Sequence, residues 1–202
     1  MIHFTPEELS ERENYKFLIG SIIPRPIALV TSSSENEVLN IAPFSYFNIV
    51  TSNPPIVSLA IQRKKGHLKD TARNILEKEE AVIHIVDLEN VVQANRTAAS
   101  LSAEESEWLR TDFTICPSQT VDVPSLNEAK IRFEVMLEQH ISLENDGVPA
   151  ADLFLLKIKR YHIHEDLYQQ GRIDPIGLAA MSRLAGHDYA EIGEIFTLKR
   201  PE

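Results

Sequence analysis

The chain has 202 residues, 43% of them hydrophobic and 25% charged, which suits one globular domain over residues 1–202 with its own core. The formal net charge of −10 argues against a general binder of nucleic acid or of anionic membranes, because such proteins need clustered Lys and Arg. With a single cysteine, Cys116, the chain cannot form an internal disulfide, which fits a reducing compartment and an ordinary structural thiol.

The N-terminal residues 1–8 carry neither the basic region nor the apolar stretch of a signal peptide. No apolar run approaches the roughly 20 residues that a membrane-spanning helix needs. We therefore expect a cytoplasmic protein that has neither nucleic acid nor a membrane as a partner.

In chain order, the sequence predicts mostly strands, with a few helices between them. Apolar or alternating runs predict strands over residues 27–32, 38–42, 56–61, 81–86, 131–138 and 153–164. Helices are expected as one turn over residues 6–9, over 70–78 with Asp70 as N-cap, over 88–99, and around Trp108 after a capping box at residues 102–105. The tail from residue 174 is rich in loops. Because the strands cluster instead of alternating with helices, a closed or nearly closed antiparallel barrel fits better than a parallel doubly wound sheet.

The segment from Asn40 to Asn48 is unusually polar for a core element. Pro43 interrupts it, so the strand must break, bulge or reach a sheet edge there. Free backbone groups beside aromatic rings could bind a flat heteroaromatic ligand. The alternative is an edge strand with a bulge and nothing bound.

A second candidate segment is the basic loop at residues 63–67 with the following helix start at residues 69–71. Helix N-termini present free amide donors and suit phosphate, and the lysines add positive charge. The alternative is a solvated turn before a capped helix. His162 and His164 have a spacing seen in some metal sites, but without a third ligand we favour surface histidines and expect no metal.

Five segments, in this order and at this spacing, resemble the flavin reductase-like family, which includes flavoredoxin and the small flavin reductases. They are Arg-Pro-Ile-Ala-Leu-Val-Thr at 25–31, Asn-Ile-Ala-Pro-Phe-Ser-Tyr-Phe at 40–47, Asn-Pro-Pro at 53–55, Lys-Asp-Thr-Ala-Arg-Asn-Ile at 69–75 and Arg-Leu-Ala-Gly-His-Asp-Tyr at 183–189. The chain departs from the family in having Ala185 where a glycine is frequent. Its first hairpin also lacks the usual glycine, although Asn36 there can take the left-handed conformation.

The resemblance implies a mainly β fold with peripheral helices, an antiparallel, Greek-key-like, FMN-binding split β-barrel that works as a homodimer. It implies that the flavin ring and ribityl chain lie against a set of strand residues, namely Thr31, Ser32, Asn40, Ala42, Pro43, Phe44, Ser45, Tyr46 and Phe47. Lys69 and Thr71 would meet the phosphate, with Asp70 as a helix cap. Arg183 would reach the site from the tail of the same subunit or of its partner.

The implied function is that of an FMN-binding flavoprotein oxidoreductase that takes a hydride from NADH or NADPH. Flavin chemistry requires no acid, base or nucleophile from the protein, so no catalytic residue is predicted. One alternative is a flavoredoxin-like electron carrier without a nicotinamide site, which would exchange electrons with a protein donor or acceptor. Another is a flavin-binding barrel with no catalytic role.

Overall fold

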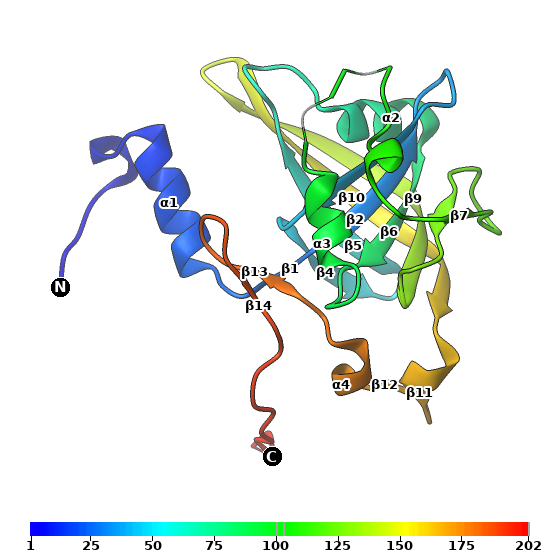
Figure 1. Cartoon of the computed structure of the whole chain (residues 1–202). Helices are drawn as coiled ribbons and strands as arrows, with labels where there is room; N and C mark the ends of the chain where they lie inside the picture. The colour runs from blue at the N-terminus through cyan, green and yellow to red at the C-terminus, as the bar shows by residue number, and fades with distance from the viewer. Residues whose placement is uncertain (100, 103, 202) are drawn as a thin grey trace.

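A curved antiparallel sheet forms the centre of the computed structural model, which describes residues 1–99, 101–102 and 104–201 (Figure 1). Its strands are β2 (Ala28–Ser33), β3 (Leu39–Phe44), β4 (Phe47–Ser52), β5 (Pro55–Gln62), β6 (Glu80–Ile85), β9 (Ile131–Asn145) and β10 (Val148–Ile163). They lie in the order β3-β2-β6-β9-β10-β5-β4, with antiparallel neighbours throughout. The edge strands β3 and β4 are consecutive in the chain, and the Ala60 amide of β5 donates to the carbonyl of Tyr46, in the corner that joins β3 to β4, at 2.8 Å. The predicted, nearly closed antiparallel barrel is thus confirmed.

Short elements surround the barrel. The outer strands are β1 (Arg25–Pro26), β7 (Ile115–Cys116), β8 (Ser125–Leu126), β11 (Tyr168–Gln169), β12 (Arg172–Ile173), β13 (Ser182–Arg183) and β14 (Tyr189–Ala190). The helices are α1 (Glu11–Ser21), α2 (Asp70–Lys78), α3 (Val91–Arg96) and α4 (Pro175–Leu178), with 3-10 turns η1 (Pro6–Glu8), η2 (Glu107–Arg110) and η3 (Glu165–Leu167). Strands β1, β13 and β14 form a separate small sheet that brings residues 25–26 next to residues 182–190.

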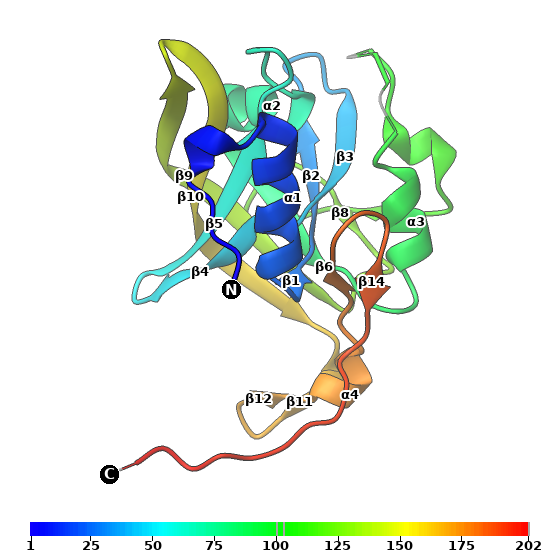
Figure 2. The ribbon, with the colours of Figure 1, turned by 90° about the vertical axis from the view of Figure 1, so that its left-hand side faces the viewer.

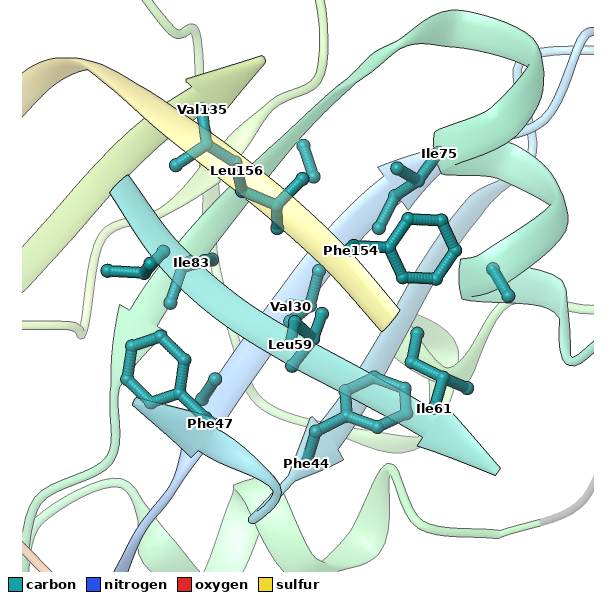
Figure 3. Close-up of a cluster of buried hydrophobic side chains, with 14 of the residues drawn as sticks. Val30, Phe44, Phe47, Leu59, Ile61, Ile75, Ile83, Val135, Phe154 and Leu156 are labelled. Atoms are coloured by element: carbon teal, nitrogen blue, oxygen red, sulfur yellow. The ribbon is translucent and has the colours of Figure 1, made fainter. Parts of the chain in front are cut away.

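The barrel interior is filled by apolar side chains from the strands and from α2 (Figure 3). Val30, Leu59 and Phe154 meet there at or near zero exposure. Leu29 and Ile41 instead face outward into a second cluster beneath the segment that follows β6. Strand β2 is therefore buried on both faces, which explains its continuous run of apolar and small residues.

Pro43 lies inside β3 without breaking it, and β3 is an edge strand of the sheet. Of the three predicted alternatives, a break, a bulge or a sheet edge, the sheet edge is confirmed. On the free side of this edge, Glu107 accepts a hydrogen bond from the Ile41 amide at 3.1 Å, and the Ser106 hydroxyl donates to the Leu39 carbonyl. Residues two apart on a strand present their backbone groups to the same side. The nitrogen of Pro43 thus faces the free edge, where no ladder hydrogen bond is lost.

Helix α1 is the main element that the sequence analysis missed. Ser10 caps it with Glu13 in a reciprocal box, but of its residues only Ile19 is buried. Figure 1 shows α1 standing off the barrel, and Figure 2 shows it running along the barrel's length. Because α1 buries so little against the barrel, it does not need a continuous apolar face, and the hydrophobic pattern in its sequence is weak.

The helix predicted over residues 70–78 is confirmed as α2 but has a different cap, and a second predicted helix is shorter than expected. Lys69, and not Asp70, is the N-cap of α2, because Asp70 already has helical geometry and pairs with Arg73 at 2.7 Å. The helix expected over residues 88–99 is confined to α3.

Two turn predictions also need correction. Ser102 and Glu105 do form hydrogen bonds, but the turn that carries Trp108 is η2, which is capped by Ser106; Ala103 lies outside the described residues. In the first hairpin Glu37, and not Asn36, takes the left-handed conformation, with φ of 61°.

Candidate cofactor-binding cleft

Three adjoining cavities share Pro43 and Phe44, and we call them together the β3 cleft. Their volumes are about 530, 230 and 150 Å³. The largest lies between β3 and the start of α2, and the other two lie toward α1 and the β13–β14 hairpin. The predicted site residues that line the cleft are Asn40, Ala42, Pro43, Phe44, Ser45, Tyr46, Lys69, Asp70, Thr71 and Arg183.

The remaining predicted residues lie elsewhere. Thr31 faces outward with Leu29, and its hydroxyl donates to the Pro124 carbonyl at 2.8 Å. Ser32 points inward but is covered by Asn40 and α2. Among the described residues, neither lines any of the three cavities. Phe47 packs in the barrel core and lines a neighbouring cavity of about 380 Å³.

The N-terminus of α2 forms one wall of the largest cavity. Over residues 1–99, 101–102 and 104–201, no side chain accepts a hydrogen bond from the amides of its first turn. Lys69 lies beside this turn, with its ammonium 5.9 Å from the centre of the Phe44 ring. Burial lowers the pKa of Lys69, and repulsion from Lys64 lowers it further. An anion bound here would neutralise the lysines and satisfy the free amide donors.

A buried polar network holds the inner end of β3 against α2. Asn40 donates to the Thr71 hydroxyl at 2.7 Å and to Ser32 at 3.4 Å, and Asn74 donates to Ser32 at 3.1 Å. All four side chains are nearly inaccessible to solvent. This network fixes the start of α2 relative to β3, the two elements that bound the largest cavity.

The basic loop before α2 is held in place by hydrogen bonds from Arg63 to the buried Asp152 of β10. Arg63 forms two hydrogen bonds, of 2.8 and 2.9 Å, with the buried Asp152 carboxylate, and a third, of 3.3 Å, with the Gly66 carbonyl. His140 contacts the same carboxylate at 2.9 Å. Burial opposes ionisation of Asp152, but the bonds from Arg63 and His140 outweigh it and lower the pKa of the carboxyl group. These hydrogen bonds thus position the loop that contains Lys64, a residue that lines the β3 cleft.

Arg25 connects α1 to the end of the chain. Its guanidinium donates to the carbonyls of Ile19 and Ile22 at the end of α1, and to that of Leu184 in the β13–β14 hairpin at 2.8 Å. It also approaches the Ser45 hydroxyl at 3.5 Å. Sequence reasoning missed this role, because the partners are backbone carbonyls that leave no signal in residue types.

Glu107 is a second cleft residue that the sequence did not reveal. It is 6% exposed, and burial raises the pKa of its carboxyl group. It lines the largest cavity while bonded to the Ile41 amide on the β3 edge. The only sequence signal was its place in the turn after Ser106.

The wall of the 230 Å³ cavity carries Arg25, Lys69 and Arg183, and none of its described lining residues is acidic. In a chain with a net charge of −10, such a one-sided lining is a strong local exception. The cavity therefore favours an anionic occupant.

The surface position predicted for two histidines holds for His164, whereas the His162 side chain is only 18% exposed. His162 contacts the Glu134 carboxylate at 2.6 Å, and His164 follows the end of β10. Among the described residues no group of three or more His, Cys, Asp or Glu is arranged to hold a metal ion. Within residues 1–99, 101–102 and 104–201, no helix is both long and apolar enough to cross a membrane.

Comparisons with known proteins agree with this architecture. Nitrilotriacetate monooxygenase component B from Bacillus cereus has 49% sequence identity and a TM-score of 0.96, over 98% of both chains. The 2-nitrobenzoate 2-nitroreductase of Pseudomonas fluorescens has 29% identity and a TM-score of 0.88, over 99% of this chain and 96% of its own. A Shewanella frigidimarina protein with a split barrel domain shares the fold at 19% identity, with a TM-score of 0.84 over the whole of both chains.

The family model described as "Flavin reductase like domain" matches residues 19–177, which include all the barrel strands, α2 and α3. The cleft described above thus lies mostly within the matched region, and Tyr15 of α1 and the β13–β14 hairpin come from beyond it. The chain belongs to the flavin reductase-like family.

Proposed function

We propose that this protein binds FMN in the β3 cleft and acts as a flavoprotein oxidoreductase that is reduced by NADH or NADPH. The observation that carries the proposal is the combination of Lys69 with the uncapped first turn of α2, at one end of a cleft whose floor is the apolar edge Pro43–Phe44. Membership of the flavin reductase-like family supports the same assignment.

The residues of the cleft fit FMN. Lys69 and the first amides of α2 offer charge and donors for the phosphate, and Thr71 adds a hydroxyl beside them. Phe44 and Tyr46 supply aromatic surface for a flat ring system, while Ser45 supplies a polar group at its rim. The largest of the three cavities of the β3 cleft, of about 530 Å³, falls within the range usual for cofactor sites.

The roles of the chain follow from this fit. Bound FMN supplies the hydride and electron chemistry itself. Lys69, Thr71 and the α2 amides bind the phosphate, and the β3–β4 corner orients the ring. Asp70 does not repel the phosphate strongly, because its carboxylate is paired with Arg73.

We further propose that a monooxygenase component receives the reduced flavin. The relative with 49% identity is itself component B of a monooxygenase, and the near-complete coverage of both chains supports a shared role.

The distribution of exposed apolar residues supports the predicted homodimer. Phe17 and Leu18 on α1 are 49% and 57% exposed, and Ile49 on β4 is 78% exposed. Helix α1 and β4 both contribute to the wall of the 380 Å³ cavity, so these residues belong to neighbouring elements. Exposed apolar residues on neighbouring elements are typical of a protein–protein interface, and we propose a second copy as the occupant of this face.

The test is an absorbance experiment on the purified protein with added FMN, without oxygen. Bleaching of the bound flavin by NADH or NADPH within minutes is expected, and the faster donor identifies the nucleotide used. Bound flavin that resists both donors but bleaches with dithionite would replace the reductase by an electron carrier. Failure to bind FMN at all would contradict the cofactor assignment.

A further inference from the structure

Arg183 is a cation without an acidic partner among the described residues. It forms no ion pair there, and its guanidinium donates to the Gly186 carbonyl in its own hairpin. It lines the two smaller cavities of the β3 cleft, on either side of Pro43 and Phe44. Its charge is thus free to meet an anion inside the cleft.

The aromatic ring of Tyr189 holds Arg183 in this place. The two residues face each other in the β13–β14 pairing, and the guanidinium carbon lies 4.4 Å from the ring centre. The Tyr189 hydroxyl donates to Asn95 of α3 at 2.9 Å, which anchors the ring to the body of the protein. Stacking on an anchored ring limits the rotamers of a long side chain without using its charge.

The phosphate of FMN does not account for this second cation. In the proposed assignment, Lys69 and the free amides of α2 bind this phosphate in the largest cavity of the cleft, which Arg183 does not line. FMN carries a single phosphate. A nicotinamide dinucleotide carries a diphosphate, for which the planar guanidinium fork is well suited.

We propose that Arg183, positioned by Tyr189, binds the diphosphate of the dinucleotide donor and so selects a dinucleotide over a simple dihydronicotinamide. Tyr189 is the positioning residue, and Arg183 is the specificity residue. The inference rests on the proposed function, because it assumes that a nicotinamide dinucleotide reduces the flavin in this cleft.

The first test compares two hydride donors with the FMN-loaded protein in the absence of oxygen. NADH carries the diphosphate, whereas 1-benzyl-1,4-dihydronicotinamide has no phosphate. The readout is the ratio of their second-order rate constants for flavin reduction. Arg183→Met should lower this ratio about tenfold, because a charge-assisted contact is lost for NADH alone. Arg160→Met, which removes an exposed arginine on β10, is the matched control and should leave the ratio within twofold.

The variants of Tyr189 separate positioning from general damage. Tyr189→Leu removes the stacked ring and should lower the ratio roughly threefold. Tyr189→Phe keeps the ring and should lower it less. A ratio that is unchanged in both Arg183→Met and Tyr189→Leu would overturn the inference.

Two binding measurements distinguish this inference from the proposed function. ADP-ribose, which contains the diphosphate but no nicotinamide, should bind the oxidised FMN-loaded protein about tenfold more weakly after Arg183→Met. Equal ADP-ribose affinity in both forms would overturn the inference even if NADH reduces the flavin. An equal loss of FMN affinity in Arg183→Met and Lys69→Met apoproteins would also overturn it, because Arg183 would then belong to the FMN phosphate site. If no nicotinamide donor reduces the wild-type protein, the proposed function fails by itself.

Discussion

Lys69 is held close to another lysine, partly buried, beside a helix terminus that also carries positive charge. Each of these features disfavours an ammonium group at that position. Each would become favourable if a phosphate were bound there. The residue is thus suited to ligand binding more than to the stability of the unliganded protein.

Replacement of Lys69 by Met should weaken FMN binding by about tenfold or more, because a charge-assisted contact to the phosphate is lost. Fluorescence quenching of FMN on titration with apoprotein measures the affinity. Lys159→Met removes an exposed lysine of β10 and serves as the control. Equal affinity in wild type and Lys69→Met would contradict the phosphate assignment.

His84 is locked in its neutral form at the centre of the molecule. Its Nδ1 donates to the Leu29 carbonyl at 2.9 Å, and its Nε2 accepts from the Leu126 amide at 3.0 Å. Complete burial lowers the pKa of the ring to about 3. Protonation would also remove the acceptor for Leu126, so the folded state requires the neutral ring.

This lock predicts a specific loss of stability in acid. The ring binds a proton in the unfolded chain below pH about 6.5, but not in the folded protein until pH about 3. The stabilisation is therefore complete above pH 6.5 and declines as the pH falls toward 3. His84→Gln keeps one donor and one acceptor but does not titrate. The unfolding free energy of wild type relative to His84→Gln should fall by about 2 kcal/mol between pH 7 and pH 5, as measured by urea denaturation. A pH-independent difference would argue against the assignment.

At the scale of single elements, α2 ends in a strained position. Glu79, the residue after α2, has φ of 58° and ψ of 17°, the left-handed conformation that favours glycine. Its side chain is exposed.

Glu79→Gly should raise the unfolding free energy by about 1 kcal/mol, because the strain of the left-handed residue is removed. Glu77→Gly, two residues earlier on the exposed face of α2, should lower it by about 1 kcal/mol, because glycine weakens a helix interior. Thermal or urea unfolding compares the two variants directly. The same sign in both would show that backbone conformation is not the cause.

Strands such as β2 and β6 could be predicted from sequence because burial demands apolar residues in a short run. Helix α1 could not, since only Ile19 is buried, although its capping box at Ser10 and Glu13 was a usable signal. The alternation of side chains along a strand also decides which residues reach a site.

Most residues of the candidate cleft came from motifs that the sequence carries in full. Thr31 was included with them, but alternation along β2 directs its side chain outward, away from the cleft. Arg25 and Glu107 were omitted because their partners are backbone groups from distant segments. Whether the cleft residues bind FMN stays a prediction, as does the single-domain organisation over residues 1–202.

At the scale of the whole molecule, apolar side chains are exposed at both ends of the chain. Phe4 and Phe17 pack against each other with ring centres 5.7 Å apart, yet both remain about half exposed. In the tail, Phe196 and Leu198 are more exposed still. A second copy would cover such residues, whereas isolated chains would leave them in water.

Leu18→Asp should convert a dimer into single chains, because it places a charge in the proposed interface. Light scattering coupled to size-exclusion chromatography measures the mass. Ile176→Asp, which changes an equally exposed apolar residue on α4, should leave the mass unchanged. A wild-type protein with the mass of one chain would exclude the dimer.

The contacts of Arg25 have a consequence for the order in which the protein is completed during synthesis. Its partner Leu184 lies 159 residues later in the chain. The last barrel strand, β10, ends at Ile163, so the whole barrel can emerge from the ribosome while the hairpin that carries Leu184 and Arg183 is still inside the exit tunnel. A nascent chain can thus have a folded barrel while one wall of its cleft is still missing, and the cleft is completed only after the hairpin has left the tunnel.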